Sequence, residues 1–327
     1  MRHLKHPIPA LILGAGIFLA PAASAGTITL ALPIDCTPGD TCYIQQYVDR
    51  DPGPGIRDYG CGTVTYQGHD GTDFALPTRA AMEAGVAVLA AAPGRVRAVR
   101  DGEADGAFLT GESVAGKECG NGVVIEHGAG WQTQYCHLKR GSIRVKPGET
   151  VATGTPLGLV GLSGLAEFPH LHLTLRENGA PVDPFLPAAA QSCTTAAQAG
   201  LWQSPLPYTP GGLLEAGFSA APPEYAAIRN GAPAETHLPA DAGALILWAY
   251  GWDSVTGDVL RVVIEGPAGF RFAQEMPVAK GQALFFRYAG KKAPPGGFAR
   301  GPYRATAELV RAGKVIGSRR ATVELGG

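Results

Sequence analysis

Four of the eight histidines in this 327-residue chain stand in three short motifs whose residue types could do metal or acid–base chemistry. The first motif contains His69 and, four residues later, Asp73; the second contains His137. The third contains His170 and His172 within an alternating apolar run. Because successive side chains of a β-strand point to opposite faces, the last two imidazoles are predicted to share one face of a strand. The leucines between and after them are expected to face the core.

These residue types suit a hydrolytic zinc site. Such a site needs three protein ligands and keeps one position open for water, and two histidines with one carboxylate meet that count. A histidine that is not a ligand can move the proton, because its ordinary pKa is about 6.5. The motifs supply one ligand set plus two spare imidazoles, and the residues alone do not decide which histidines bind the metal. The plainer alternative, hydrogen-bonded core or loop histidines, suits one isolated histidine and not this concentration.

The composition indicates a folded protein that does not bind nucleic acid. Hydrophobic residues make up 45% of the chain and charged residues 17%, with a formal net charge of −1. A nucleic-acid-binding protein would show a basic patch or an elevated isoelectric point. The 46 glycines and 27 prolines, together with few helix-period stripes, favour short strands and tight turns. We therefore expect an all-β fold.

The N-terminal segment is predicted to be a signal peptide. Residues 1–25 combine a basic start, an apolar stretch and the cleavage-site pattern Ala23-Ser24-Ala25. The alternative, an uncleaved anchor, would need an apolar run of about 20 residues, and this one is shorter. No later segment is apolar enough to be a membrane span. The mature protein is expected to be periplasmic or secreted.

Six cysteines fit an oxidising compartment. One pair brackets a turn-forming loop, a second flanks a predicted hairpin, and the last two remain for each other. The predicted pairing is Cys36–Cys42, Cys119–Cys136 and Cys61–Cys193. The alternative, a structural zinc site built from thiolates, lacks any C-x-x-C spacing.

The rest of the chain divides into four segments. Residues 26–61 form an irregular lead-in segment that wraps the next domain and is tied down by disulfides, and residues 62–202 form an antiparallel β catalytic domain with a cleft. Residues 203–212 have the composition of a linker. Residues 213–327 alternate apolar and polar positions between regularly spaced turns, which predicts a small immunoglobulin-like β-sandwich.

The last segment contains no convincing catalytic cluster. His237 stands alone and is interpreted as a surface residue. Trp248, Tyr250 and Trp252 could form a carbohydrate platform, but strand aromatics at this spacing more often belong to a core, which is the interpretation we favour. In the catalytic segment, His127 is interpreted as a hairpin-turn residue.

Taken together, the histidine motifs closely resemble those of the lysostaphin/LytM-type zinc metallopeptidases, which cleave peptidoglycan. The matching stretches are Gly68–Asp73, Gly120–Gly128, Tyr135–Leu138, Val145–Gly148, Gly154–Gly158 and Pro169–His172. The resemblance covers roughly residues 62–187, and it implies a lysostaphin-like antiparallel β domain.

The resemblance also assigns roles to the site residues. It implies that Zn²⁺ is bound by His69, Asp73 and His172. It gives His170 the role of general base or of orienting the water, and it gives His137 the role of stabilising the oxyanion or the leaving group.

Two positions call for separate comment. Asp70 lies where the family is variable, and we interpret it as a solvated turn residue. At Leu173-Thr174-Leu175 the family more often has an aromatic and an acidic residue. This departure changes the packing beside the site but removes no ligand.

The sequence thus predicts an exported zinc endopeptidase that hydrolyses stem or cross-link peptides of peptidoglycan. One alternative is a protease that acts on Gly-rich protein. Another is a non-catalytic wall-binding or regulatory module that activates a partner hydrolase, since some members of the resembled family have lost ligands. This chain has kept them all, and a closed structural zinc site would not require His137 and His170. The role of the C-terminal domain stays open.

Overall fold

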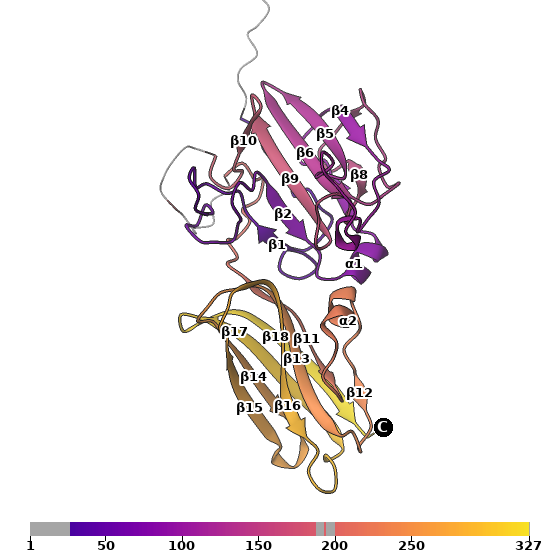
Figure 1. Cartoon of the computed structure of the whole chain (residues 1–327), viewed down its shortest axis with the longest axis vertical. Helices are drawn as coiled ribbons and strands as arrows, with labels where there is room; N and C mark the ends of the chain where they lie inside the picture. The colour runs from indigo at the N-terminus through magenta and orange to yellow at the C-terminus, as the bar shows by residue number, and fades with distance from the viewer. Residues whose placement is uncertain (1–26, 188–192, 194–199, 327) are drawn as a thin grey trace, which may run out of the picture.

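The computed structural model describes residues 27–187, 193 and 200–326, so the predicted signal peptide lies outside the described residues. Figure 1 shows two β-rich domains arranged one above the other, the N-terminal domain in indigo to magenta and the C-terminal domain in orange to yellow. Strands predominate throughout, and the helices are short. The predicted all-β class is confirmed.

The first domain is built on an antiparallel sheet in the strand order β1-β2-β9-β6-β5-β4-β7, with β10 also paired to β9. The bounds are β1 Tyr43–Gln46, β2 Thr72–Ala75, β4 Gly94–Arg100, β5 Asn121–Gly128, β6 Trp131–Leu138, β7 Thr150–Val151, β9 His170–Glu177 and β10 Ala180–Val182. A small second sheet pairs β3 (Ala87–Leu89) with β8 (Pro156–Leu159). Helix α1 (Arg79–Ala84) follows β2, and the 3-10 turn η1 (Phe108–Thr110) lies in the long loop before β5.

Strand β9 has the predicted alternation. Leu171, Leu173 and Leu175 are buried in the core of the first domain. His170 and His172 therefore lie on the opposite face of the sheet, where neighbouring strands can add further side chains. The core of the sheet thus fixes which way the two imidazoles point.

The lead-in segment is more integrated than predicted. It supplies the edge strand β1, which pairs with β2. Leu30, Ile34 and Tyr47 from this segment are fully buried in the same core as the β9 leucines. The segment therefore belongs to the first domain and does not merely wrap it, because its apolar residues complete the core.

The predicted disulfide pairing is confirmed. The three bonds are Cys36–Cys42, Cys61–Cys193 and Cys119–Cys136. The last of them joins β6 to the loop that precedes β5, next to His137.

The second domain is a sandwich of two sheets, in the strand orders β11-β13-β16 and β12-β18-β17-β14-β15. The bounds are β11 Gly212–Ser219, β12 His237–Leu238, β13 Ala244–Ser254, β14 Val259–Glu265, β15 Arg271–Pro277, β16 Gln282–Lys292, β17 Gly301–Arg311 and β18 Lys314–Leu325; the 3-10 turn η2 covers Pro267–Gly269. Side chains of both sheets form one core, for example Phe285 with Ile264 and Tyr303. The immunoglobulin-like type of this sandwich stays a prediction.

The aromatic stripe of β13 is buried, as predicted, but outside the sandwich core. Trp248 and Tyr250 pack under helix α2 (Tyr225–Asn230), and Trp252 packs against Tyr43 of the first domain with ring centroids 4.8 Å apart. Because these rings are covered, they are not available as a carbohydrate platform.

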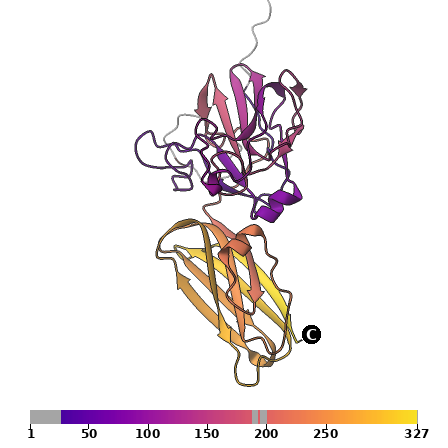
Figure 2. The same ribbon diagram turned by 45° about the vertical axis from the view of Figure 1, so that its right-hand side comes forward.

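The two domains meet through α1 and α2, which lie side by side in both views (Figures 1 and 2). Arg229 of α2 donates a hydrogen bond to the carbonyl of Glu167 at 2.9 Å, and the Gln45 amide donates to the carbonyl of Ala283 at 3.0 Å. A pocket of about 160 Å³ opens at this junction, and Phe168 and Arg229 are among the residues that line it. The second domain therefore contributes surface close to the site described next.

Candidate metal centre

The structure brings the three predicted ligands together. His69 lies in the loop just before β2 and Asp73 lies within β2, where it is the direct cross-strand partner of His172 on β9. His69 Nε2 lies 3.1 Å from His172 Nδ1, and Asp73 Oδ1 lies 3.2 Å and 2.8 Å from these two nitrogens. Pairing of two adjacent strands thus places three potential donor atoms around one point.

The outer contacts of the two imidazoles determine which nitrogens are free. His69 Nδ1 lies 2.7 Å from the carbonyl oxygen of Tyr47, which only accepts, so this nitrogen carries the hydrogen. His172 Nε2 lies 3.2 Å from the Asp70 carboxylate and 3.0 Å from the Thr174 hydroxyl, so there the Nε2 atom carries it. In the neutral imidazoles, both remaining nitrogens are then bare. Two lone pairs and a carboxylate facing one another are stabilised by a cation between them.

The donor set fits zinc. Zinc binds imidazole nitrogen at about 2.0–2.1 Å in tetrahedral sites, which puts neighbouring donor atoms about 3.3 Å apart. The three separations of 2.8–3.2 Å are close to that value. Mixed imidazole and carboxylate donors suit zinc, whereas calcium and magnesium prefer all-oxygen sets.

Gly71, between His69 and Asp73, is required by the approach of β9. A Cβ atom on this residue would lie 2.5 Å from His172 Nε2 and 2.7 Å from the carbonyl oxygen of Leu173. Any other side chain would displace the imidazole of His172. The close approach of His172, which is distant in the sequence, therefore explains why a glycine is needed at position 71.

Electrostatics favour a positive charge at this point. Burial raises the pKa of Asp73, but the neighbouring imidazoles of His69, His170 and His172 stabilise the carboxylate, outweigh burial and hold this pKa well below its usual range. Burial lowers the pKa of His172, but hydrogen bonds with Asp70 and Asp73 outweigh it and raise the pKa to about 9. A buried anionic centre of this kind attracts a proton or a metal ion.

The other two motif histidines lie beside the ligands. His170 Nδ1 faces the carbonyl of Phe168 at 2.8 Å, and His137 Nδ1 faces the carbonyl of Ser163 at 2.8 Å. Each therefore carries its hydrogen on Nδ1 and leaves Nε2 as a free base. Their rings are 4.5 Å apart, and His170 Nε2 lies 3.8 Å from Asp73 Oδ1.

Both of these imidazoles are expected to be neutral. Burial lowers the pKa of His137 well below its ordinary value, and neighbouring His170 and His172 lower it further. Burial also lowers the pKa of His170, although the Asp73 carboxylate offsets part of the shift. Near pH 7 the site therefore offers two bases next to the three ligand atoms.

His137 owes its direction to a β-bulge that the sequence did not reveal. Asn121 of β5 pairs with Leu138 and Val123 pairs with Tyr135, so β6 contains one residue more than β5 between these pairs. His137 is within this extra stretch and has a left-handed backbone, with φ 64°. Bulges of this kind redirect a side chain, and histidine tolerates the conformation better than most non-glycine residues.

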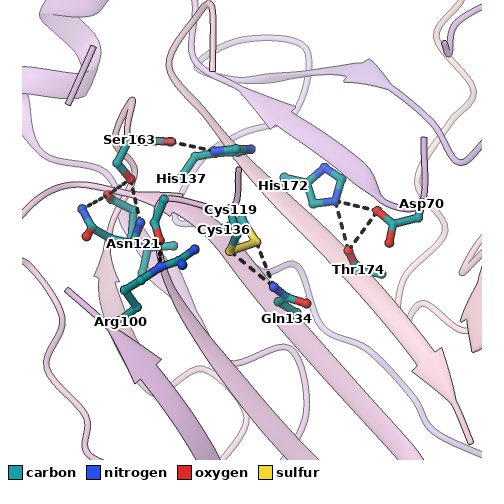
Figure 3. The surroundings of a disulfide bond; sticks show 12 residues. Asp70, Arg100, Cys119, Asn121, Gln134, Cys136, His137, Ser163, His172 and Thr174 are labelled. Atoms are coloured by element: carbon teal, nitrogen blue, oxygen red, sulfur yellow. Dashed lines mark hydrogen bonds and ion pairs between the residues drawn. A yellow bond between two sulfur atoms is a disulfide. The ribbon is translucent and has the colours of Figure 1, made fainter. Parts of the chain in front are cut away.

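The bulge is held by the Cys119–Cys136 disulfide, shown in Figure 3. The backbone amide of His137 donates to the carbonyl of Cys119 at 2.8 Å. On the other side the buried Asn121 side chain donates to the carbonyl of Leu138 at 3.0 Å. The disulfide and these hydrogen bonds fix the chain on both sides of His137.

The prediction for Asp70 is wrong. Its side chain is partly exposed, at 41%, but Oδ1 lies 3.2 Å from His172 Nε2 and Oδ2 accepts from Arg176 Nη2 at 3.1 Å. Asp70 and His172 are 102 residues apart in the chain, so nothing in the local sequence indicated the contact. Asp70 is part of the site's surroundings and not a free turn residue.

The remaining described histidines lie outside the site, as expected. His127 contacts the carbonyl of Pro93 at 2.8 Å and the Thr133 hydroxyl at 2.7 Å, which gives it a structural role at the hairpin end. His237 is exposed and contacts Thr236.

The first domain thus belongs to the class of antiparallel β domains that carry a His-Asp-His donor set next to free imidazoles. Residues 67–184 match the family model described as Peptidase family M23, so this part of the chain resembles that family. The predicted resemblance is confirmed.

Several characterised proteins resemble a part of this chain. The peptidoglycan DD-endopeptidase ShyA of Vibrio cholerae is 36% identical over 115 residues, which is 35% of this chain and 22% of ShyA. The cell division protein DipM of Caulobacter vibrioides is 40% identical over 73 residues, which is 20% of this chain and 12% of DipM. The matched region therefore spans about a fifth of the length of ShyA.

Among solved structures, the catalytic domain of the prophage-encoded M23 protein EnpA from Enterococcus faecalis is 26% identical, with a TM-score of 0.32. The match covers 45% of this chain and 92% of that domain. With a TM-score this low, the likeness adds nothing to the assignment, which depends on the family match and the motifs.

Proposed function

We propose that this chain is an exported zinc-dependent endopeptidase that hydrolyses peptide bonds in the stem or cross-link peptides of peptidoglycan. The observation that carries the proposal is the convergence of two bare imidazole nitrogens, from His69 and His172, with the Asp73 carboxylate. The family match and the printed function of ShyA, a peptidoglycan DD-endopeptidase, support the substrate class.

His69 Nε2, His172 Nδ1 and Asp73 Oδ1 would hold the zinc ion. Zinc bound there supplies Lewis acidity toward the scissile carbonyl and acidifies water to a pKa of about 7. The other functions belong to the imidazole pair, by which we mean His137 and His170. The free Nε2 of His170 can accept the proton of the attacking water and pass it to the leaving amine.

His137 has a related role in this proposal. Its Nε2 is bare, so it stabilises negative charge on the carbonyl oxygen only after it gains a proton. Once either member of the imidazole pair is protonated, its positive charge lies beside the reacting carbonyl and favours the charge that develops there. The two histidines would thus act as one proton-transfer unit.

The proposed location rests on two features. Residues 1–25 have the pattern of a signal peptide, and all three disulfides suit an oxidising compartment. In the described part of the chain, no helix has the length and apolar character needed to cross a bilayer.

The alternative is a non-catalytic wall-binding or regulatory module that activates a partner hydrolase. A metal with a purely structural role would not need two free imidazole bases held next to it. The arrangement of His137 and His170 therefore favours the enzyme.

The test is a digest of purified peptidoglycan with the mature protein, with and without a zinc chelator, read by mass spectrometry of the released fragments. We expect loss of cross-linked dimers that the chelator abolishes and added zinc restores, and the fragment masses will identify the bond. The His170→Ala variant serves as the inactive control. Bound zinc without release from any wall type would contradict the proposal, and cleavage of Gly-rich protein alone would redirect it to a protein substrate.

A further inference from the structure

Of the four motif histidines, three are oriented by the main chain and one is oriented by side chains. The three have Nδ1 against a carbonyl oxygen at 2.7–2.8 Å and direct Nε2 into the site. The pairs are His69 with Tyr47, His137 with Ser163, and His170 with Phe168. His172 is reversed, because it directs Nδ1 at the other ligands and its Nε2 toward side chains on the outside.

These outer side chains belong to Asp70 and Thr174, as Figure 3 shows. Asp70 Oδ1 lies 3.2 Å from His172 Nε2, and the Thr174 hydroxyl oxygen lies 3.0 Å from the same atom. Both oxygens can accept the Nε2 hydrogen. As long as Asp70 is ionised it can only accept, so it admits only the tautomer that leaves Nδ1 bare.

Asp70 is itself held in place by a second set of side chains. Arg176, two residues further along β9 than Thr174, donates from Nη2 to Asp70 Oδ2 at 3.1 Å and from Nη1 to the Gln134 amide oxygen at 2.8 Å. The Gln134 amide nitrogen lies 3.3 Å and 3.4 Å from the sulfurs of Cys119 and Cys136. This row of side chains therefore joins the outer face of His172 to β6.

The chemistry of such a row is well defined. A metal-ligating histidine whose other nitrogen donates to a carboxylate is fixed in tautomer and ring orientation, and it is a stronger base toward the metal. In this chain the residue two positions after His172 is Thr174, which carries no charge. The carboxylate comes instead from Asp70, between the ligands His69 and Asp73.

We propose that Asp70 is a positioning residue for the metal centre, which holds His172 with Nδ1 free for the metal, and that Arg176 acts through Asp70 by keeping its carboxylate in place. The inference depends on the metal site of the proposed function but not on the substrate. Asp70 contacts the predicted ligand His172 directly, so its effect should be on metal affinity first.

The central experiment compares Asp70→Asn with Glu177→Gln in the full-length mature chain. Asparagine can turn its NH₂ group toward Nε2, which favours the tautomer with hydrogen on Nδ1 and blocks the metal-facing atom. Glu177→Gln removes the same charge from the strand that carries His172, but Glu177 is exposed and its side chain lies on the face opposite His172. Zinc affinity is measured by competition with a chromophoric chelator. We expect affinity to fall about 10- to 100-fold in Asp70→Asn and to be unchanged in Glu177→Gln.

A double-mutant cycle tests the role of Arg176. Arg176→Met keeps the length of the side chain and removes its donors, and we expect a smaller loss of zinc affinity than in Asp70→Asn. If Arg176 acts only through Asp70, then Arg176→Met has no further effect when Asp70→Asn is already present. Additive losses would overturn this part of the proposal.

A direct readout is the tautomer of His172, observed in two-bond ¹H–¹⁵N correlation spectra of imidazole-labelled, zinc-loaded protein. We expect hydrogen on Nε2 in the wild type, and native thermal unfolding and circular dichroism in each variant. Wild-type zinc affinity in a folded Asp70→Asn variant would overturn the proposal. Another outcome is that the wild type binds zinc, with lower zinc affinity in Asp70→Asn, and yet cleaves no wall type. In that case the proposed function fails and the positioning role of Asp70 stands. A wild type without zinc affinity would overturn both.

Discussion

The two groups of residues in the site, the ligand group and the imidazole pair, are held by different kinds of structure. The ligand group, His69, Asp73 and His172, is assembled by the pairing of β2 with β9, in which Asp73 and His172 are direct partners. The imidazole pair depends on loops: His137 lies in a bulge, and both members take their direction from loop carbonyls. The ligand group should therefore be sensitive to side-chain changes, and the imidazole pair to changes in the path of the main chain.

The largest expected effects come from alanine substitutions, which should affect the ligand group and the imidazole pair differently. His172→Ala removes a ligand, so we expect loss of bound zinc and of all peptidoglycan cleavage. His170→Ala leaves the ligand group intact, so zinc should stay bound while turnover falls about 10²- to 10⁴-fold. Metal content by mass spectrometry and the muropeptide assay check both. A full equivalent of zinc in His172→Ala would show that the ligand assignment is wrong.

A smaller effect on turnover is expected when the disulfide that holds the main chain beside His137 is removed. The double variant Cys119→Ser/Cys136→Ser removes the disulfide that closes the bulge, across a separation of 17 residues. Loop-closure entropy predicts a loss of about 3 kcal/mol in the free energy of unfolding. We expect lower kcat with unchanged zinc content, because the ligand group does not depend on this bond.

The matched control is Cys36→Ser/Cys42→Ser, which removes another disulfide away from the site. This control variant should have a lower free energy of unfolding than the wild type and an unchanged kcat. If both double variants lose kcat equally, the disulfide next to His137 has no special role, and the distinction between the two groups weakens.

The smallest effect concerns pH and the neutral state of the imidazole pair. Burial holds the pKa of His137 well below its ordinary value of about 6.5. Below that pH the unfolded chain binds a proton that the folded state does not, so stability falls as pH falls, by up to about 1.4 kcal/mol per pH unit. His137→Asn tolerates the left-handed backbone and cannot titrate.

The measurement is the urea midpoint of zinc-free protein between pH 7.5 and 5. We expect a steeper loss for the wild type than for His137→Asn. Parallel curves would indicate that His137 is protonated in the folded state, contrary to its proposed role as a free base.

The strand positions of the motif histidines were predictable from sequence because the information is local, whereas the choice of ligands came from the family resemblance. Two-residue spacing in an apolar run placed His170 and His172 on one strand face, and the turn after His127 predicted the β5–β6 hairpin. Both features depend on strand periodicity and turn residues within a few positions. The structure has them where the sequence predicted them.

The rest was not predictable because it depends on contacts distant in sequence or on main-chain atoms. Asp70 meets His172 across 102 positions. The carbonyl of Tyr47, which orients His69, belongs to a lead-in segment that appeared peripheral, and a carbonyl has no residue-specific signature. The bulge at His137 arises because β6 has one residue more than β5 between two cross-strand residue pairs. The alternation of apolar and polar residues alone does not reveal this extra residue.

The junction between the domains has a consequence for solubility. Strand β1 is the edge of the catalytic sheet, and an uncovered edge is a template for pairing with another chain. The second domain packs Trp252 on Tyr43 of this strand, and Gln45 reaches the carbonyl of Ala283. Without residues 213–327 the first domain would expose an apolar edge strand next to the strand that carries Asp73. We therefore expect the first domain without residues 213–327 to self-associate more readily than the whole chain.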